Sequence, residues 1–141
     1  MKNVMFEPKI KINIGIIITD GKKILFGYVP EKDEFDILKV PFTNYKDTIM
    51  ETLLYELKEM FIDIKEEQLQ SLGYFNYTPF EDLDMFIYPM ENLLNEKKLN
   101  FNYVDLDGKH YNNYIYIPFE ELKSKINIYL YNLLKKIFKF D

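Results

Sequence analysis

Two glutamates, Glu56 and Glu59, are the residues of this 141-residue chain whose type and spacing best fit metal chemistry. They lie three positions apart in the run LLYELKEM, inside a segment whose apolar residues recur with a helical period. Residues three apart on a helix are neighbours, so the two carboxylates can converge on one cation. The alternative is a solvated helix face on which these glutamates pair with lysines.

A helix is expected to carry these glutamates, from a cap at Asp47 or Thr48 to about Phe61. Its apolar stripe is formed by Ile49, Leu53, Leu57 and Met60. Glu56 borders this stripe, and Glu59 lies next to it on the same flank. We therefore expect both carboxylates to face a concavity beside the helix, with Met60 in the core.

The segment before this helix predicts a hairpin. Lys11 to Thr19 is almost continuously apolar, which indicates a strand buried on both faces. Asp20-Gly21 is a two-residue hairpin signal, and Lys22 to Val29 is its expected partner strand. A charged loop should follow at 30–36, and then a short strand at 37–40 that ends before Pro41.

The segment after the helix predicts further strands and a second helix. Strands are expected at 72–77, 83–90 and 114–117, with a turn at 78–82 and a hairpin at Asp107-Gly108. From Pro118 one long helix is expected, apolar nearly all round from Ile126 to Phe140, so it should pack on the sheet and contact a second subunit. The result is an α+β fold in one domain, residues 1–141, with a mixed sheet between helices.

Composition limits the partners and the location. All eighteen basic residues are lysine, and the net charge is -5. Without arginine there is no bidentate clamp for phosphate, and an acidic chain does not favour a nucleic-acid groove. The chain has no cysteine, no apolar run long enough to span a membrane and no signal peptide. We therefore expect a cytoplasmic protein with no membrane partner.

The order of hairpin, loop, short strand, helix, strands and helix resembles the Nudix hydrolases. Residues 55–60, YELKEM, are similar to the Arg-Glu-aliphatic-x-Glu-Glu core of that family's motif. Glu56, Leu57 and Glu59 agree with it, whereas Tyr55 replaces the arginine and Met60 replaces the second glutamate of the pair. The loop at 41–46 lacks the family's glycines.

This resemblance implies a Nudix-like mixed sheet between helices and a nucleoside-diphosphate-type ligand. It also implies that Glu56 and Glu59 are the catalytic and metal-binding residues, which would hold Mg²⁺ or Mn²⁺ weakly and support a weak pyrophosphohydrolase activity. A thioether at Met60 cannot supply the oxygen that Mg²⁺ requires. The alternative is an inactive Nudix-fold domain that binds another protein, and a homodimer fits either hypothesis.

Two other features qualify as site candidates under the resemblance. Glu81, Asp82 and Asp84 form an acidic cluster, and one of them is a candidate general base because loops in this region face the substrate in the family. The alternative for these three is a solvated turn. His110 lies in the Asp107-Gly108 hairpin, where a lone histidine is most often solvated.

Overall fold

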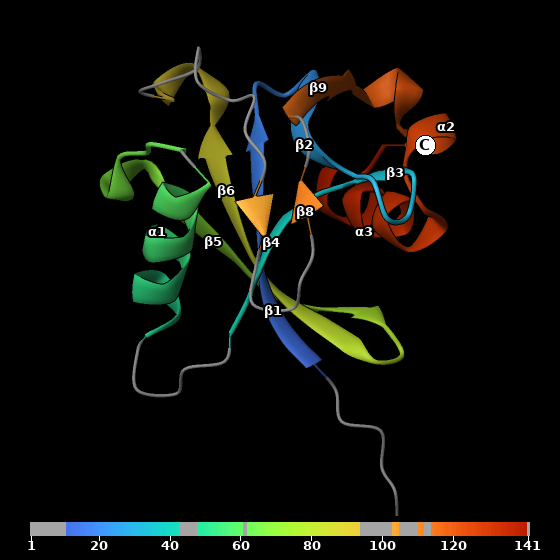
Figure 1. Ribbon diagram of the computed structural model, residues 1–141. Helices are drawn as coiled ribbons and strands as arrows, with labels where there is room; N and C mark the ends of the chain where they lie inside the picture. The colour runs from blue at the N-terminus through green and yellow to red at the C-terminus, as the bar shows by residue number, and fades with distance from the viewer. Residues whose placement is uncertain are drawn as a thin grey trace, which may run out of the picture.

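The computed structural model describes residues 11–42, 48–60, 62–93, 103–104, 110–111 and 114–140, with the backbone alone at 103–104 and 110–111. Its centre is a mixed seven-stranded sheet (Figure 1). The strands are β1 (Lys11–Thr19), β2 (Lys23–Val29), β3 (Glu34–Asp36), β4 (Leu38–Pro41), β5 (Gln70–Thr78), β6 (Glu81–Pro89) and β9 (Tyr114–Pro118). The helices are α1 (Ile49–Glu59), α2 (Leu122–Lys125) and α3 (Ile128–Phe138).

The strand order is β3-β2-β1-β6-β5, with β4 paired to β1 and β9 paired to β2. Strand β1 runs parallel to β6 along its whole length, and the other pairings in this sheet are antiparallel. Two short strands, β7 (Tyr103–Val104) and β8 (His110–Tyr111), form a separate pair. This pair is consistent with the hairpin expected at Asp107-Gly108, although residues 105–109 lie outside the described residues.

Helices cover both faces of the sheet, α1 on one side and α3 on the other (Figure 1). The alternating side chains of β1 divide between the two layers, because successive residues of a strand point to opposite faces. Ile14, Ile16 and Ile18 pack with α1, and Ile17 packs with α3. The predicted burial of this strand on both faces is confirmed, and so is the α+β sandwich.

The turn after β1 forms where Asp20-Gly21 predicts it. The Asp20 carboxylate accepts hydrogen bonds from the backbone N–H groups of Lys22 and Lys23, at 2.8 and 3.0 Å, and these bonds lower the pKa of Asp20. Gly21 has a φ of 89°, which suits glycine. The hairpin itself is shorter than expected, because β1 and β2 pair only at Thr19 and Ile24. From Asn13 to Ile16, β1 pairs with β4 instead.

Two expectations for the short strands were wrong. The predicted loop at 30–36 contains β3, which pairs with β2 from Glu34 to Asp36. Pro41 does not stop β4 but is its last residue, opposite Asn13. A proline is tolerated at the end of an edge segment, where its missing N–H costs no ladder bond.

The single C-terminal helix that the sequence predicts is interrupted. Ile126 is extended and bridges Phe35, and Asn127 then starts α3 with its side chain accepting from the N–H of Leu130 at 2.9 Å. The reason is local, because an asparagine cap in extended conformation competes with helix continuation. Among the described residues, no helix is long and apolar enough to cross a lipid bilayer.

Candidate functional site

Helix α1 holds the candidate glutamates against the sheet. Thr48 caps it, since its hydroxyl accepts a hydrogen bond from the N–H of Glu51 at 3.0 Å. Leu53 and Leu57 are buried in the layer between α1 and the sheet. These contacts fix the rotation of the helix about its axis, and with it the direction of every other side chain. The alternative cap, Asp47, lies outside the described residues.

Glu56 and Glu59 lie on one flank of α1, beside the buried stripe, as predicted. Glu56 is half-buried and Glu59 is exposed. Tyr55 is 62% exposed, and its phenol forms a hydrogen bond with Glu59 that, with the charges of Glu59 and Glu56, raises its pKa. The residue in the arginine position of the motif therefore contacts the carboxylates as a hydrogen-bond donor without bringing a positive charge.

Met60 is fully buried in the core between α1 and the sheet. The Tyr114 hydroxyl donates a hydrogen bond to its main-chain oxygen, at 3.5 Å. Burial raises the pKa of Tyr114, so its phenol keeps the proton that it donates. The core role predicted for Met60 is confirmed, and its side chain is committed to packing.

In the part of the chain that the structure describes, the donor atoms near Glu56 and Glu59 do not make a complete divalent-metal site. Mg²⁺ takes about six oxygen ligands in octahedral geometry. Among the described residues, no group of three or more aspartate, glutamate, cysteine or histidine side chains could hold a metal ion. Two carboxylates fit a cation bound mainly through water, which is a weak site.

A pocket of about 390 Å³ opens beside α1, but on the other flank. Its lining includes Leu54, Lys58, Ile62 and Ile64, together with Tyr55. Neither Glu56 nor Glu59 lines it, nor do they line the other three pockets described. The concavity expected at the two glutamates stays a prediction.

The acidic cluster at 81–84 is not a solvated turn. The turn is confined to Pro79 and Phe80, and β6 begins at Glu81. Alternation along the strand sends Glu81 towards the α3 face and Asp84 towards the α1 face. Asp84 is 7% exposed, and burial raises the pKa of its carboxyl. Glu81 and Asp84 therefore lie on opposite faces of the sheet and cannot act together.

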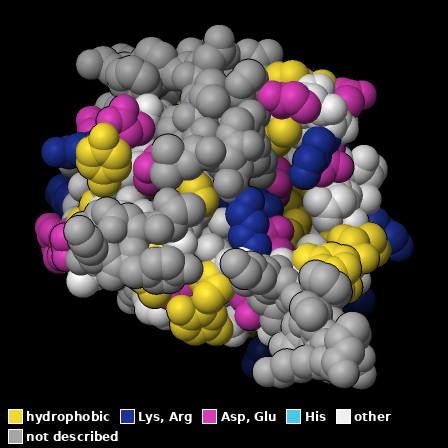
Figure 2. All heavy atoms as spheres, turned by 60° about the horizontal axis from the view of Figure 1, so that its bottom comes forward, with side chains coloured by type: hydrophobic (Ala, Val, Ile, Leu, Met, Phe, Trp, Pro, Cys, Tyr) yellow, Lys and Arg dark blue, Asp and Glu magenta, His cyan; other side chains and the backbone are white. Residues whose placement is uncertain are grey.

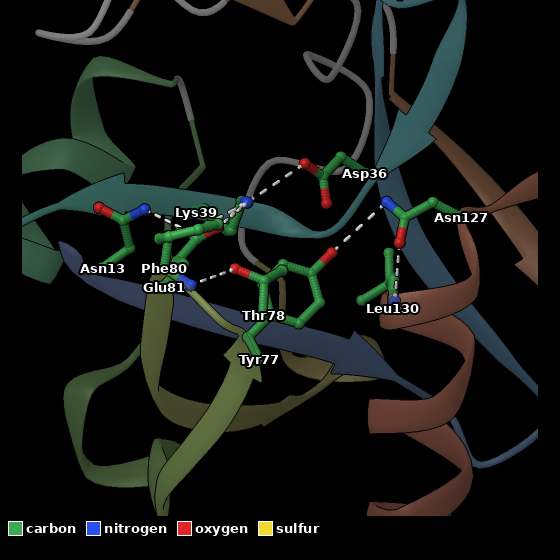
Figure 3. A network of polar contacts seen from close by, with 9 residues as sticks. All are labelled: Asn13, Asp36, Lys39, Tyr77, Thr78, Phe80, Glu81, Asn127 and Leu130. Carbon is green, nitrogen blue, oxygen red and sulfur yellow. Dashed lines mark hydrogen bonds and ion pairs between the residues drawn. The ribbon is translucent and has the colours of Figure 1, made fainter. Parts of the chain in front are cut away.

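Glu81 belongs to a buried polar cluster on the α3 face of the sheet (Figure 3). The ammonium of Lys39 lies 3.2 Å from a Glu81 oxygen and 3.5 Å from an Asp36 oxygen. Asn13, which is 6% exposed, donates an amide hydrogen bond to Glu81 at 2.5 Å. The cluster joins β1, β3, β4 and β6 at one end of the sheet.

Burial alone would lower the pKa of Lys39, but the carboxylates of Asp36 and Glu81 outweigh it and raise that pKa. The ammonium also lies 5.0 Å from the centre of the Tyr77 ring. Burial, followed by the Asp36 charge, raises the pKa of Tyr77. The cluster therefore contains a lysine that stays charged and a phenol that stays neutral across the physiological range.

Tyr77 connects this cluster to α3. The amide of Asn127 donates to the Tyr77 hydroxyl at 3.5 Å, while its oxygen caps the helix (Figure 3). A single asparagine thus positions the start of α3 against β5. Lys39 pairs with the carboxylates of Asp36 and Glu81, and the amide of Asn13 donates to Glu81, so the cluster is best explained as a structural core group.

No protein-family model and no curated protein matches the sequence. Among solved structures, a Nudix hydrolase from Nitrosomonas europaea matches with a TM-score of 0.60 and 14% identity, over 96% of this chain and 74% of that chain. A bifunctional NMN adenylyltransferase/ADP-ribose pyrophosphatase from Francisella tularensis matches with a TM-score of 0.62 and 11% identity, over 96% and 43%.

The protein has the Nudix fold.

A third match is a chain of the complex between the C-terminal domain of mouse MUTYH and human PCNA, with a TM-score of 0.61, 10% identity, and coverage of 90% of this chain and 86% of that chain. The chain spans about half, 47%, of the matched MutT/nudix family protein from Enterococcus faecalis. At such identities the likeness concerns the fold. The Nudix fold accounts for the placement of α1 against the sheet. It does not determine which reaction, if any, the side chains of this chain support.

Sequence reasoning missed the polar cluster within this Nudix fold. The available signal was polar residues that interrupt apolar strands, namely Asn13 within KINIGIIIT and Lys39 within LKVP. Their partner, Glu81, is 68 and 42 residues away. Of the other sequence candidates, His110 lies in β8, and its side chain falls outside what is described.

Proposed function

We propose that the protein binds a nucleotide or another diphosphate-linked small molecule beside α1, and that Glu56 and Glu59 contribute a weak site for Mg²⁺ or Mn²⁺. The observation that carries this proposal is the position of both carboxylates on one flank of α1 in a Nudix fold. The Francisella tularensis neighbour is described as complexed with AMP and a Mn ion, which supports a nucleotide as the ligand class.

Activity follows the quality of the metal site. With Met60 in the core and Tyr55 in the arginine position, this flank supplies two carboxylates and a phenol. Such a set would hold a divalent cation weakly, so little positive charge would be available to stabilise a reacting diphosphate, and pyrophosphohydrolase activity is slow. A small-molecule ligand also suits the surface. In Figure 2, the coloured lysine and acidic side chains are interspersed, and they form no continuous positive strip of the kind that nucleic acid requires.

Calorimetric titration with ADP, with and without Mn²⁺, tests the proposal. We expect weak binding that strengthens when Mn²⁺ is present and falls back to the metal-free value in the double variant Glu56→Gln, Glu59→Gln. The control is Glu120→Gln, Glu121→Gln, which removes two exposed carboxylates between β9 and α2. Equal loss in both double variants would show a general charge effect and reject the site.

A second candidate is an interaction domain without catalysis. Full burial of Met60 favours it, because the position of a metal ligand has been taken over by the core. The matched chain from the complex between the C-terminal domain of mouse MUTYH and human PCNA is a neighbour described with a protein partner. Absence of binding to Mn²⁺ and ADP at millimolar concentrations would favour this candidate over the first.

A further inference from the structure

Strand β5 forms one edge of the seven-stranded sheet (Figure 1). It pairs with β6 on one side, from Gln70 to Thr78. Among the described residues, no backbone hydrogen bond reaches its other side. An edge of this kind presents a row of N–H and C=O groups that can pair with another strand.

This edge lacks the protection that charged residues give. The strand reads QSLGYFNYT, without a lysine, glutamate or aspartate, in a chain with 29% charged residues. It is irregular near its ends, with register shifts between Ser71 and Gly73 and between Asn76 and Thr78. Between them Gly73–Asn76 stays in register with β6. Gly73 has a φ of 94°, so the uncharged segment of regular strand that is available for pairing is Tyr74–Asn76.

Tyr74 is the central residue of Gln70–Thr78, and its side chain is 61% exposed. When two identical strands pair antiparallel about a two-fold axis, the residue at the axis faces its own copy. Centring on Tyr74 places the two phenol rings side by side and the two uncharged segments opposite each other. Aromatic cross-strand pairs stabilise a sheet, whereas like charges in this position would oppose association.

We propose that two copies of this chain associate through antiparallel pairing of their β5 strands, centred on Tyr74, so that the two sheets become one continuous sheet. The partner is a second copy because the segment is complementary to itself in backbone hydrogen bonds and carries no charge that an acidic or basic peptide could select. This surface differs from the C-terminal helix that the sequence favours for subunit contact. Only two exposed apolar residues, Ile128 and Tyr129, lie on α3 among the described residues.

The absence of cysteine makes a direct test possible. In the variant Tyr74→Cys, the two thiols face each other across the axis, with Cα atoms about 4.5–5.5 Å apart in an antiparallel pair. That spacing lies within the range of a disulfide. Mild oxidation is expected to give a covalent dimer. Tyr55→Cys, at an equally exposed tyrosine on α1, is the control and is expected to stay monomeric in a denaturing gel.

Sedimentation of the native chain supplies the second measurement. Dimers are expected to grow with protein concentration in the wild type and in Tyr55→Lys, and to be lost in Tyr74→Lys, which places like charges at the axis. Thermal melts confirm that each variant is folded. A wild type that is monomeric at every concentration, a dimer that persists in Tyr74→Lys, or equal cross-linking of both cysteine variants would overturn the proposal.

Discussion

The hydroxyl of Tyr114 donates a hydrogen bond to the main-chain oxygen of Met60, at 3.5 Å, in the interior of the molecule. This contact joins the end of α1 to β9 and holds the Met60 side chain in the core. The end of the helix that carries the glutamates is thereby fixed against the sheet. Met60, which stands where the family's motif has another glutamate, serves in packing.

Replacement of Met60 by glutamate should destabilise the protein. The substitution Met60→Glu places a carboxyl in an apolar layer with no partner, at a cost of about 3 kcal/mol in the free energy of unfolding. Thermal melts measure the loss. Because the side chain is directed into the core, roughly 10 mM Mg²⁺, a saturating level for a weak site, should not restore stability. Recovery with Mg²⁺ would mean that this residue can reach the flank of Glu56 and Glu59.

Asp84 should make stability depend on pH. Burial raises its pKa above the value of an unfolded chain, so the folded state keeps a proton that the unfolded state releases. Stability is then greater at acid pH and falls as the pH rises through the folded pKa. Asp84→Asn should stabilise the protein at pH 7 by about 1 kcal/mol and have little effect near pH 4.

Urea unfolding at several pH values checks this dependence. Asp82→Asn, two residues earlier on the same strand and half-buried, is the control. If Asp84→Asn lowered stability at pH 7, the ionised carboxylate would have to be making a favourable contact, and the assignment would fail.

Lys39 should be needed for the polar cluster. Lys39→Met leaves the carboxylates of Asp36 and Glu81 buried without their shared cation. Removal of one partner from a buried pair costs about 3 kcal/mol. Chemical denaturation measures it, and Lys22→Met, at an exposed lysine in the β1–β2 turn, should change little. If Lys39→Met were as stable as the wild type, the two carboxylates would be accommodated by protonation or hydration without loss of unfolding free energy, and the prediction would fail.

Asn127 should stabilise the start of α3. Its side chain accepts from the N–H of Leu130 and donates to Tyr77, so Asn127→Ala removes a cap and a contact with β5. The expected loss is about 1 kcal/mol, the usual value for a helix cap. Asn132→Ala, at an exposed position within α3, is the control and should be neutral or slightly stabilising. Similar effects of both variants would argue against the cap.

Local patterns were enough to predict much of the fold. The apolar run of β1, the Asp20-Gly21 turn and the stripe that ends at Met60 each depend on residues close in sequence. The interruption at Asn127 was missed because a helical period on both sides hides one capping residue. The pairing of β4 with β1, and the parallel pairing of β1 with β6, depend on contacts between distant segments that periodicity does not encode.

The candidate site was predictable to the same extent. The shared flank of Glu56 and Glu59 follows from helical spacing, and the burial of Met60 from its place in the stripe. The separation of Glu81 from Asp84 required the true start of β6, which is two residues earlier than the expected start at Leu83. The ion pair between Lys39 and Glu81 could not be predicted without the order of the strands in the sheet. It forms because β4 and β6 both pair with β1.

A titration of Mn²⁺, followed by electron paramagnetic resonance of the free ion, tests the central claim most directly. We expect weak binding, with about one ion per chain at millimolar concentration, because the site has few carboxylate ligands. That binding should disappear in Glu56→Gln, Glu59→Gln and persist in Glu120→Gln, Glu121→Gln. Mn²⁺ binding that is unchanged when Glu56 and Glu59 are both replaced would contradict the account.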